Sequence, residues 1–228
     1  MTNDQWLFCL SSFVLRLKFK EITMIYLDDE HEEEQEQENG EQKEKDGGFN
    51  VMKQLLETRT ILLFGEINMK VAEKISQQLL LLAADSDDDI KIVINSPGGH
   101  VESGDTIFDM IRFVKPAVKI IGTGWVASAG ALIYAAADKE NRYSLPNTRF
   151  LLHQPMGGTG IRQASDIAIE AEEIIKMRRR LNETFAEQTG QPIERVERDT
   201  ERNFWLSAEE AKEYGLVDKV ITSIEEVE

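Results

Sequence analysis

Between residues 50 and 224, short apolar runs alternate with longer segments whose apolar residues recur at helical spacing. The short, mostly β-branched runs predict strands at 59–64, 90–94, 118–121 and 216–221, with a further extended segment at 150–153. The longer segments predict helices at 68–84, 101–114, 127–137 and 166–187, and a capping box at 207–210 predicts the start of one more. Strand–helix units in succession are typical of an α/β domain with layers and mostly parallel strands.

The first 49 residues differ in composition and are predicted to form an extension outside this domain, which we place at 50–224. Residues 28–46 contain 11 acidic residues, 2 lysines and no apolar residue, so they carry −9 of the chain's formal charge of −16. Such a segment cannot bury enough apolar surface to offset the entropy of ordering, and we expect a disordered acidic arm. Its role is interpreted either as plain solvated chain or as a docking or solubilising segment.

A mostly apolar run at 6–15 raises the question of a signal peptide. Asp4 precedes this run, its basic neighbours Arg16, Lys18 and Lys20 follow it, and no small-x-small cleavage site is present. This order argues against secretion. Met24, where the composition changes, is a second candidate start, which the mass of the native protein would decide.

The charge balance and the cysteine count exclude several classes of protein. The chain has 26 Lys and Arg against 42 Asp and Glu, so it repels the phosphates that a nucleic-acid-binding protein must bind. One cysteine, Cys9, permits neither an internal disulfide nor a cysteine-rich zinc site. No run of 18 apolar residues is present, so no membrane-spanning helix is predicted. We expect a cytoplasmic protein without a metal or other cofactor.

Two loops after predicted strands carry residues suited to chemistry, because sites in open α/β sheets lie beyond the carboxyl ends of strands. The first loop, 95–100, contains Gly98 and Gly99, whose tolerance of positive φ lets backbone N–H groups face a ligand; a tight turn is the structural alternative. The second loop, 122–130, places Ser128 at the start of an apolar helix. Its hydroxyl is there either a nucleophile beside oxyanion-binding amides or a helix cap.

A nucleophilic serine needs a base, and the chain has three histidines. His31 lies in the acidic arm, whereas His100 and His153 follow predicted strands, and spacing alone leaves both open as partners of Ser128. The pattern G-x-G-x-x-A at 122–127 also fits the loose dinucleotide fingerprint. A nucleotide site is disfavoured, because the pattern comes late in the order of elements and lacks an acid at the end of the next strand.

Five segments resemble, in the same order, the proteolytic subunit of the Clp protease: NSPGG at 95–99, GWVASAG at 124–130, LPNTRFLLHQP at 145–155, the helix at 166–187 and ERDTERNFWLSAEEAKEYGLVD at 197–218. The resemblance covers residues 52–221. It implies a single-domain, ClpP-like fold of the crotonase superfamily with layered strand–helix repeats and a long protruding handle helix. It also implies a serine endopeptidase of two stacked heptameric rings around a chamber, a homo-oligomer into which an ATP-driven unfoldase feeds unfolded polypeptides.

The resemblance also assigns site residues. The nucleophile falls on Ser128, the histidine on His153, and the two oxyanion amides on Gly99 and Ala129. The implied chemistry is acyl transfer through an acyl-enzyme. Extended backbone near 150–160 would pair with the bound peptide as an added strand.

The third triad position departs from the family pattern. Asn203 stands where the family commonly has aspartate. An amide oxygen can orient the imidazole but adds little to the stability of its charged form; losing the carboxylate costs a Ser-His-Asp protease about 10⁴-fold in rate, although papain-like enzymes use asparagine. We therefore expect a slower peptidase with a Ser-His-Asn triad. Asp199 is the substitute candidate, and a surface role in a charged helix is its alternative.

The sequence also departs from the family pattern in segments that concern binding partners. Lys91 and Val93 stand where the family often has aromatics that grip the unfoldase, although Phe113 retains one, and the acidic arm replaces the family's axial segment. These changes argue against conventional docking, and the arm becomes a candidate gate that repels anionic chains. The apolar stripe of the 166–187 helix is expected in the core or between rings, and Arg178–Arg180 either pair across an oligomer interface or are solvated.

Two alternatives to an active peptidase use the same residues. Asn203 favours a catalytically weak or inert subunit that shapes a mixed ring. A coenzyme-A enzyme of the same superfamily would use the paired amides to stabilise a thioester enolate. That enzyme would need a coenzyme pocket and acidic catalysts in the helix, and it would leave Ser128 and His153 without a role.

Overall fold

The computed structural model describes residues 51–157 and 163–227. The strands are β1 (Thr60–Phe64), β2 (Ile90–Ser96), β3 (Val118–Ala127), β4 (Arg142–Ser144), β5 (Arg149–Leu152), β6 (Phe204–Ser207) and β7 (Lys219–Val220). The helices are α2 (Val51–Glu57), α3 (Met69–Asp85), α4 (Val101–Phe113), α5 (Ala129–Tyr134), α6 (Ala164–Thr189), α7 (Ile193–Asp199), α8 (Ala208–Tyr214) and the 3₁₀ turns η2 (Lys139–Asn141) and η3 (Ile224–Glu226). The predictions for the acidic arm, Cys9 and His31 lie outside the described residues, and the domain boundary at 49/50 stays a prediction.

The sheet branches at β3. Strands β1, β2, β3, β4 and β7 lie in that order and pair in parallel. The first half of β3 pairs with β4, whereas its second half, Trp125–Ala127, pairs in parallel with β5, and β6 joins β5 antiparallel. The predicted α/β class with mostly parallel strands is confirmed. Because parallel strands end at the same edge, the loops after β2, β3 and β5 meet there.

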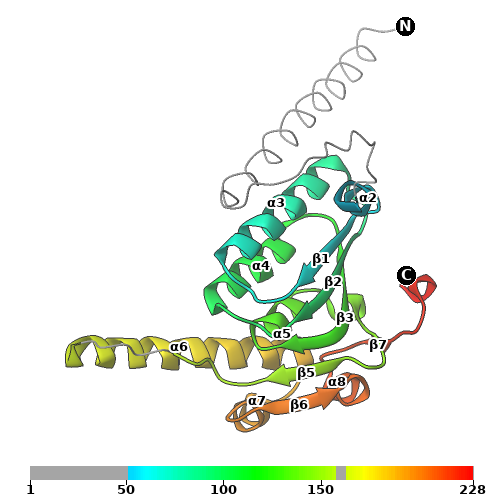
Figure 1. Ribbon diagram of the computed structural model, residues 1–228. Coiled ribbons are helices and arrows are strands. Elements are labelled where there is room, and N and C mark those ends of the chain that lie inside the picture. Colours follow the sequence, from blue (N-terminus) through cyan, green and yellow to red (C-terminus); the bar gives the residue numbers. More distant parts are fainter. Residues whose placement is uncertain (1–50, 158–162, 228) are drawn as a thin grey trace, which may run out of the picture. The chain divides into compact units, whose positions relative to one another are not determined.

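Helices α3 and α4 pack on one face of β1–β3 (Figure 1). The strands bury alternate residues toward these helices, as the period of a β-strand requires. The buried residues of this layer include Ile61, Leu63, Ile92 and Ile94 from the strands and Ile75, Leu79, Ile107 and Ile111 from the helices. Helix α5 is buried along its whole length. The core therefore supports the edge of the sheet at which the three loops meet.

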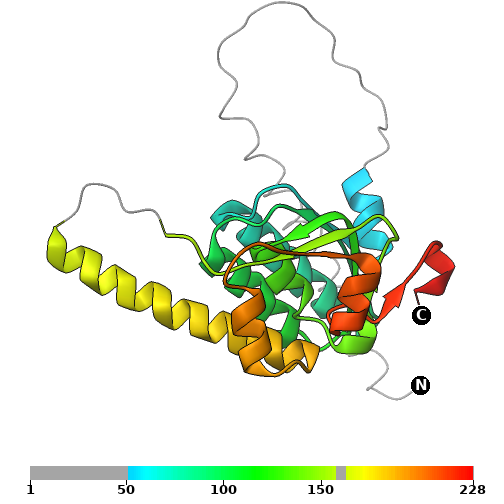
Figure 2. The same ribbon diagram turned by 90° about the horizontal axis from the view of Figure 1, so that it is seen from below.

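Helix α6 is the long handle that the resemblance implied, and it projects from the rest of residues 51–227 (Figures 1 and 2). Only its C-terminal half is buried, through Leu181, Asn182, Phe185 and Thr189. Ile167 is 43% exposed, so this end of the predicted apolar stripe does not enter the core of the chain. Whether it lies between rings stays a prediction.

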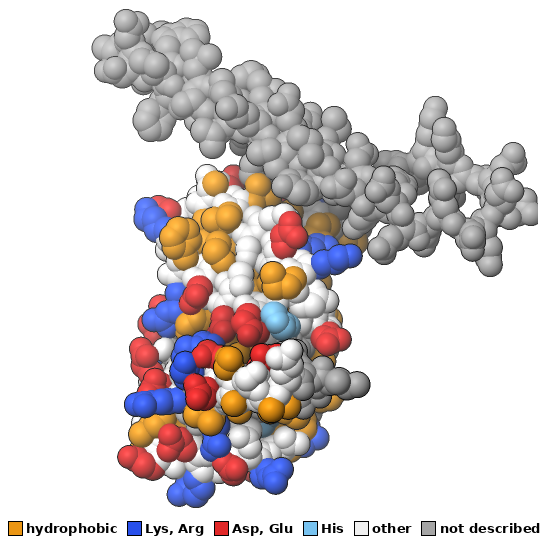
Figure 3. All heavy atoms as spheres, turned by 90° about the vertical axis from the view of Figure 1, so that its left-hand side faces the viewer, with side chains coloured by type: hydrophobic (Ala, Val, Ile, Leu, Met, Phe, Trp, Pro, Cys, Tyr) orange, Lys and Arg blue, Asp and Glu red, His pale blue; other side chains and the backbone are white. Residues whose placement is uncertain are grey.

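The three arginines of α6 are paired within the chain. The pairs are Arg178–Glu201, Arg179–Glu183 and Arg180–Asp105. The last pair is bidentate, with both N–O distances at 2.7 Å, and it ties α6 to α4. Acidic and basic side chains accordingly lie next to one another on the face seen in Figure 3. The expectation of a solvated cluster agrees with the exposure of these side chains, which are 33%, 79% and 49% exposed, although each guanidinium also has an acidic partner. Pairing across an oligomer interface stays a prediction.

Several boundaries differ from the predicted ones. Strand β3 is ten residues long and continues to Ala127, so most of the predicted loop at 122–130 is strand, and α5 begins two residues later than expected. The predicted last strand shrinks to two residues. Elements α2, β4, α7 and β6 were not predicted. They contain three to seven residues, too few for hydrophobic periodicity to reveal them.

Candidate active site

A bulge bends the end of β3. Between the pairs Ile94–Gly122 and Ser96–Val126, β2 advances by two residues while β3 advances by four. Gly124 takes φ +57° inside the bulge, and the Trp125 N–H donates to the Asn95 side-chain oxygen at 3.2 Å. A bulge changes the direction of the strand that contains it, and bulges are common beside active sites.

Ser128 forms the corner between β3 and α5. Its φ of +55° and ψ of −121° lie in a region that costs a non-glycine residue about 1–3 kcal/mol and that is found mainly at functional sites. The Ser128 N–H donates to Leu151 O at 2.9 Å, and its carbonyl accepts from the Leu132 N–H at 3.1 Å. The hydroxyl makes no capping hydrogen bond, so the helix-cap alternative is wrong. Backbone contacts hold the corner, and the hydroxyl has no structural task in it.

Glycines let neighbouring backbone approach this corner closely. A Cβ on Gly98, whose φ is +94°, would lie 2.6 Å from Ser128 Cβ and 2.7 Å from Ala127 O. A Cβ on Gly104 of α4 would lie 3.1 Å from Ala129 Cβ. Real Cβ atoms do not approach to 2.6 Å, so no other residue fits at position 98 unless the loop or the Ser128 corner moves.

The amides of Gly99 and Ala129 lie on these two touching segments. Ile67 donates to Gly98 O and accepts from the His100 N–H, both at 2.9 Å, so the Gly99 N–H faces away from Ile67. Ala129 is the first residue of α5, and its N–H has no intrahelical acceptor. The position that a Cβ of Gly98 would take is 3.0 Å from Ala129 N. Two unpaired amide donors beside a serine hydroxyl are the parts from which an oxyanion hole is built.

Ser128 and His153 line one narrow pocket, although 25 positions separate them. The rest of the lining is apolar: Val101, Ala129, Leu132, Leu152, Pro155, Leu181 and Phe185. The residues come from α4, α5, α6 and the end of β5. Among the described contacts, no hydrogen bond joins the two side chains. The structure thus brings the predicted serine and histidine to one pocket without pairing them.

The tautomer of His153 follows from its hydrogen bond. His153 Nδ1 lies 2.7 Å from Gln154 O. A carbonyl only accepts hydrogen bonds, so Nδ1 carries the proton and Nε2 of the neutral ring is an acceptor. This is the tautomer that a general base needs at Nε2. A backbone carbonyl holds the Nδ1 proton here, which is the task expected of Asn203.

Asn203 and His153 flank the end of the ladder between β5 and β6. The last pair is Leu152 with Phe204, so His153 directly follows one paired residue and Asn203 directly precedes the other. The register is not continued beyond them, since the Gln154 N–H donates to Thr200 O. Asn203 is exposed, and no hydrogen bond to His153 is present among the described residues. The backbone brings the two residues together, but their side chains are not paired.

The other titratable candidates lie in different surroundings. Asp199 is partly exposed, at 14%; it accepts from Tyr214 OH at 3.3 Å and lies 3.5 Å from the Arg195 Nε of the same helix, so its place in a charged helix is as expected although it is not fully exposed. These contacts also occupy it elsewhere than at His153. His100 Nδ1 contacts Ser103 Oγ at 2.8 Å, and its Nε2 lies 3.2 Å from Glu102. His100 is absent from the lining of the Ser128 pocket.

The structure argues against two alternative functions, a nucleotide-binding site and a coenzyme-A enzyme. The G-x-G-x-x-A pattern lies within β3 instead of in a strand-to-helix loop, so it cannot present amides to a pyrophosphate. Helix α5, with the sequence AGALIY, contains no acidic residue, so the acids required by the coenzyme-A alternative are missing from it.

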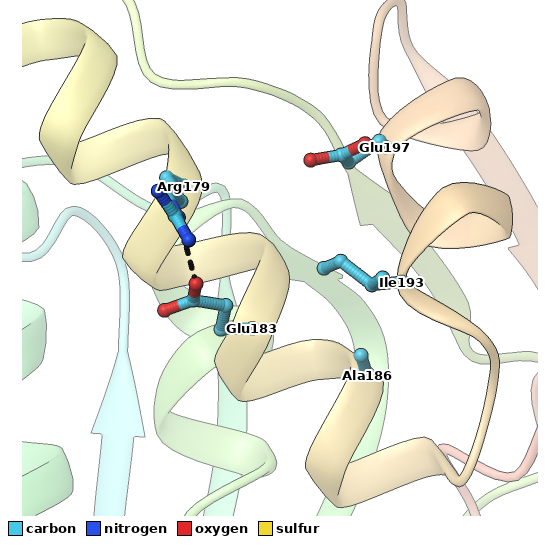
Figure 4. A pocket seen from close by; sticks show the side chains of 5 residues that line it. All are labelled: Arg179, Glu183, Ala186, Ile193 and Glu197. Carbon is cyan, nitrogen blue, oxygen red and sulfur yellow. Dashed lines mark hydrogen bonds and ion pairs between the residues drawn. The ribbon is translucent and has the colours of Figure 1, made fainter.

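A second groove lies between α6 and α7 (Figure 4). Its lining is Arg179, Glu183, Ala186, Ile193 and Glu197. The ion pair between the first two residues, at 2.9 Å, occupies one wall. None of these side chains is a nucleophile or a histidine, so this groove is not the candidate site.

Within residues 51–157 and 163–227, no group of three or more His, Cys, Asp or Glu side chains is placed to hold a metal ion. In the same ranges, none of the helices combines the length and the apolar character needed to cross a lipid bilayer.

Reasoning from the sequence missed Gln154. Its N–H donates to Thr200 O and its side-chain amide donates to Glu201 O, both at 2.8 Å, besides the bond from His153 to its carbonyl. A glutamine after a histidine has no distinctive pattern, so the sequence offers no signal for this role.

The chain is similar to known proteins over most of its length. The Clp protease family matches residues 42–224. The ATP-dependent Clp protease proteolytic subunit 3 of Rhizobium etli is 60% identical over 181 residues, which cover 79% of this chain and 93% of that protein. Proteolytic subunit 2 of Pseudomonas aeruginosa is 58% identical over 180 residues, which cover 79% of this chain and 89% of that protein.

Solved structures are similar as well. ClpP1 from Listeria monocytogenes is 55% identical, with a TM-score of 0.71 over 78% of this chain and 99% of that chain. An Asn-to-Asp variant of the same protein is 56% identical, with a TM-score of 0.73 over the same shares. The ClpP-like α/β fold and the assignment to the Clp-type proteolytic subunits, which are hydrolases, are thereby confirmed. The chain belongs to the Clp protease family.

Proposed function

We propose that the chain is a serine endopeptidase whose nucleophile is Ser128 and whose general base is His153. The observation that carries the proposal is that these two residues, distant in sequence, line the same apolar pocket. The strained backbone of Ser128 and the absence of a capping bond support it, because strain of this kind is retained where a reactive group must be presented.

In the proposed mechanism, His153 Nε2 removes the proton of the Ser128 hydroxyl as its oxygen attacks the substrate carbonyl. The N–H groups of Gly99 and Ala129 donate to the oxyanion of the tetrahedral intermediate. The imidazolium then returns the proton to the leaving amine, and the acyl-enzyme remains. Water, deprotonated by His153, attacks the ester carbonyl and releases the acid, which restores the Ser128 hydroxyl.

The apolar lining of the pocket suggests the substrate class. Leu132, Leu181 and Phe185 form walls on which an apolar substrate side chain would lose its contact with water. We expect cleavage next to apolar residues of unfolded polypeptides. The extended backbone at 150–157 would pair with the substrate as an added strand.

Asn203 is proposed as the third member of the triad. Its Oδ1 can accept from His153 Nδ1–H once the ring leaves the Gln154 carbonyl, because the two residues adjoin the last pair of the ladder between β5 and β6. Since an amide carries no charge, it would orient the imidazolium without neutralising it.

Assembly and partners are proposed from the relatives, several of which are named ATP-dependent proteolytic subunits. We propose that the chain forms an oligomer, two stacked heptameric rings being the expected form, and receives substrates from an ATP-driven unfoldase. Lys91 and Val93 are half-buried on β2, and the exposed side chains beside them on β1 are Leu62 and Phe64. An apolar docking surface here would therefore depend on β1 more than on β2.

A second candidate function is a catalytically weak or inert subunit of a mixed ring. The observation that favours it is the hydrogen bond from His153 Nδ1 to Gln154 O, together with the exposed Asn203. In that case the Ser128 pocket would still be present, but its histidine would stay turned away from the third residue.

Labelling with a fluorophosphonate separates the two functions, because the reagent reacts only with an activated serine. We expect covalent modification of Ser128 and cleavage of short fluorogenic peptides with an apolar residue before the scissile bond. Ser128→Ala should abolish both, whereas Ser76→Ala should change neither, because the half-buried Ser76 hydroxyl donates to Ala72 O within α3 and does not line the Ser128 pocket. Absence of labelling in the native oligomer would overturn the peptidase and favour the inert subunit.

A further inference from the structure

Gln154 connects three parts of the candidate site. Its carbonyl accepts from His153 Nδ1 at 2.7 Å. Its N–H donates to Thr200 O at 2.8 Å, and its side-chain Nε2 donates to Glu201 O at 2.8 Å. One residue therefore contacts both the histidine and two successive carbonyls of the turn that leads to Asn203.

The first of these carbonyls belongs to an immobile residue. Thr200 is 1% exposed, and its hydroxyl shares its one proton between Asn182 Oδ1 of α6, at 2.9 Å, and Val196 O, at 2.8 Å. Asn182 is itself 3% exposed. Buried and satisfied polar groups fix geometry strongly, because breaking one leaves its partner unpaired away from water. The turn thus starts from a rigid point.

The turn loses this support after Thr200. Residues 201–203 are exposed, and β6 begins only at Phe204. The contacts that hold this stretch are the Gln154 Nε2 bond to Glu201 O and the ion pair of the Glu201 carboxylate with Arg178. Of these two contacts, the Gln154 side-chain bond joins residues 201–203 to the strand end carrying His153, whereas the Gln154 N–H bond joins only the start of the turn, at Thr200.

We propose that the Gln154 side chain is a positioning residue for the triad. It holds the 201–203 turn against the end of β5, so that Asn203 stays within reach of His153 Nδ1. This inference rests on the proposed function and adds to it a determinant that neither touches substrate nor exchanges a proton. A turn without this bond would spend less time in the geometry that orients the imidazole.

The test is Gln154→Met, which keeps the length of the side chain and the backbone bonds but removes the Nε2 donor. In the native oligomer we expect kcat for peptide cleavage to fall about tenfold with KM changed less than twofold, because one hydrogen bond of ordinary strength is lost. The matched control is Gln77→Met on α3, whose amide donates to Glu73 at 3.2 Å far from the site and whose removal should leave kcat unchanged.

A double-mutant cycle with Asn203→Ala distinguishes positioning from a general structural role. If Gln154 acts through Asn203, Gln154→Met should cost at most about twofold in kcat once Asn203 is gone. Equal costs in both backgrounds would overturn the inference while leaving the peptidase intact. Native protein that fluorophosphonate does not label would overturn the peptidase and, with it, this role.

A measurement that does not depend on catalytic activity completes the test. Hydrogen exchange of the peptide spanning residues 199–205 should be faster in Gln154→Met than in the native chain, while peptides of α3 and α4 exchange as before. Unchanged exchange in this segment would also overturn the inference, whatever the activity of the oligomer.

Discussion

The two sides of the candidate site are held by different kinds of contact. The Ser128 side is fixed by backbone packed on backbone: Gly98 touches the corner so closely that a Cβ would lie 2.6 Å from Ser128 Cβ, and Gly104 lies against Ala129. The His153 side is held by polar contacts near the surface, among them the bond of His153 to the Gln154 carbonyl and the Gln154 side-chain bond to the exposed turn at 201–203.

This difference indicates where activity can be tuned. Close-packed backbone has few alternative arrangements, so the nucleophile side is either intact or broken. Solvent-exposed hydrogen bonds open at low cost, so the base side can exist in more than one arrangement. Variation in the rate of such a site is therefore expected to come from the histidine and its supporting residues.

The largest effect is expected at Gly98, on the rigid side. Gly98→Ala should lower the free energy of unfolding by about 3 kcal/mol and peptide cleavage by about 100-fold, since the new Cβ clashes with Ala127 O and the residue must keep a positive φ. The control is Gly65→Ala, where φ is +85° but nothing lies within 4 Å of the new Cβ. Thermal unfolding and peptide hydrolysis measure the two quantities. Equal losses in both variants would mean that strain alone, rather than contact with the corner, explains the cost.

On the base side, Asn203→Asp should raise kcat for peptide cleavage by about tenfold. A carboxylate near His153 stabilises the imidazolium that an amide leaves uncompensated, and the exposed position makes the gain smaller than the 10⁴-fold seen in buried triads. Asn147→Asp adds the same charge in an exposed turn away from the site and should change nothing. Steady-state kinetics at constant ionic strength make the comparison. No gain would count against Asn203 as the third member.

The free energy of unfolding at high pH is expected to depend on Tyr214, whose hydroxyl contacts Asp199 at the end of α7. Burial, and then the neighbouring Asp199, raise the pKa of Tyr214 to about 12. A raised folded-state pKa contributes stability that is present below the unfolded value of about 10 and is lost as the pH rises from 10 to 12. We expect Tyr214→Phe to unfold with a weaker pH dependence between pH 9 and 12, the two proteins differing by about 1 kcal/mol. Denaturant unfolding between pH 9 and 12 measures this difference. If the free energies of unfolding of the two proteins changed in parallel with pH, the raised pKa of Tyr214 would be contradicted.

The smallest effect is expected for the ion pair between α6 and α4. Arg180 and Asp105 form a bidentate pair, and the hydrogen bond to Asp105 raises the pKa of Arg180. Because both groups are partly exposed, a double-mutant cycle with Arg180→Ala and Asp105→Ala should give a coupling of about 0.5–1 kcal/mol, decreasing in high salt. Arg179 and Glu183, neighbours on one helix face, serve as the comparison pair and should couple less. A coupling that salt does not change would indicate packing instead of charge.

The elements that could be predicted from the sequence are those with long, regular patterns. The helices now seen as α3, α4 and α6 and the strands β1 and β2 follow from hydrophobic periodicity, and Ser207 does cap α8 in a capping box with Glu210. The end of β3 could not be predicted, because Gly122 and Gly124 are typical of a loop, whereas the sheet pairs Gly122 with Ile94 and Ser144 and continues past Gly124 through a bulge. Local propensity was overridden there by hydrogen bonds to β2, β4 and β5.

The residues of the candidate site also fall into two groups, those that the sequence indicated and those that only the fold reveals. Residue types and order singled out Ser128 and left His100 and His153 open as its base, and the family resemblance then assigned His153. The paired strands bring His153, and not His100, to the pocket of Ser128, because β3 and β5 are neighbours and end at the same edge. The proposed role of Gln154 and the contacts of Asp199 depend on side chains that meet residues far along the chain. Gln154 meets Glu201 across 47 positions, and Asp199 meets Tyr214 across 15. Periodicity reports which face of an element is apolar, whereas contacts between distant segments exist only once the chain has folded and close packing has selected them.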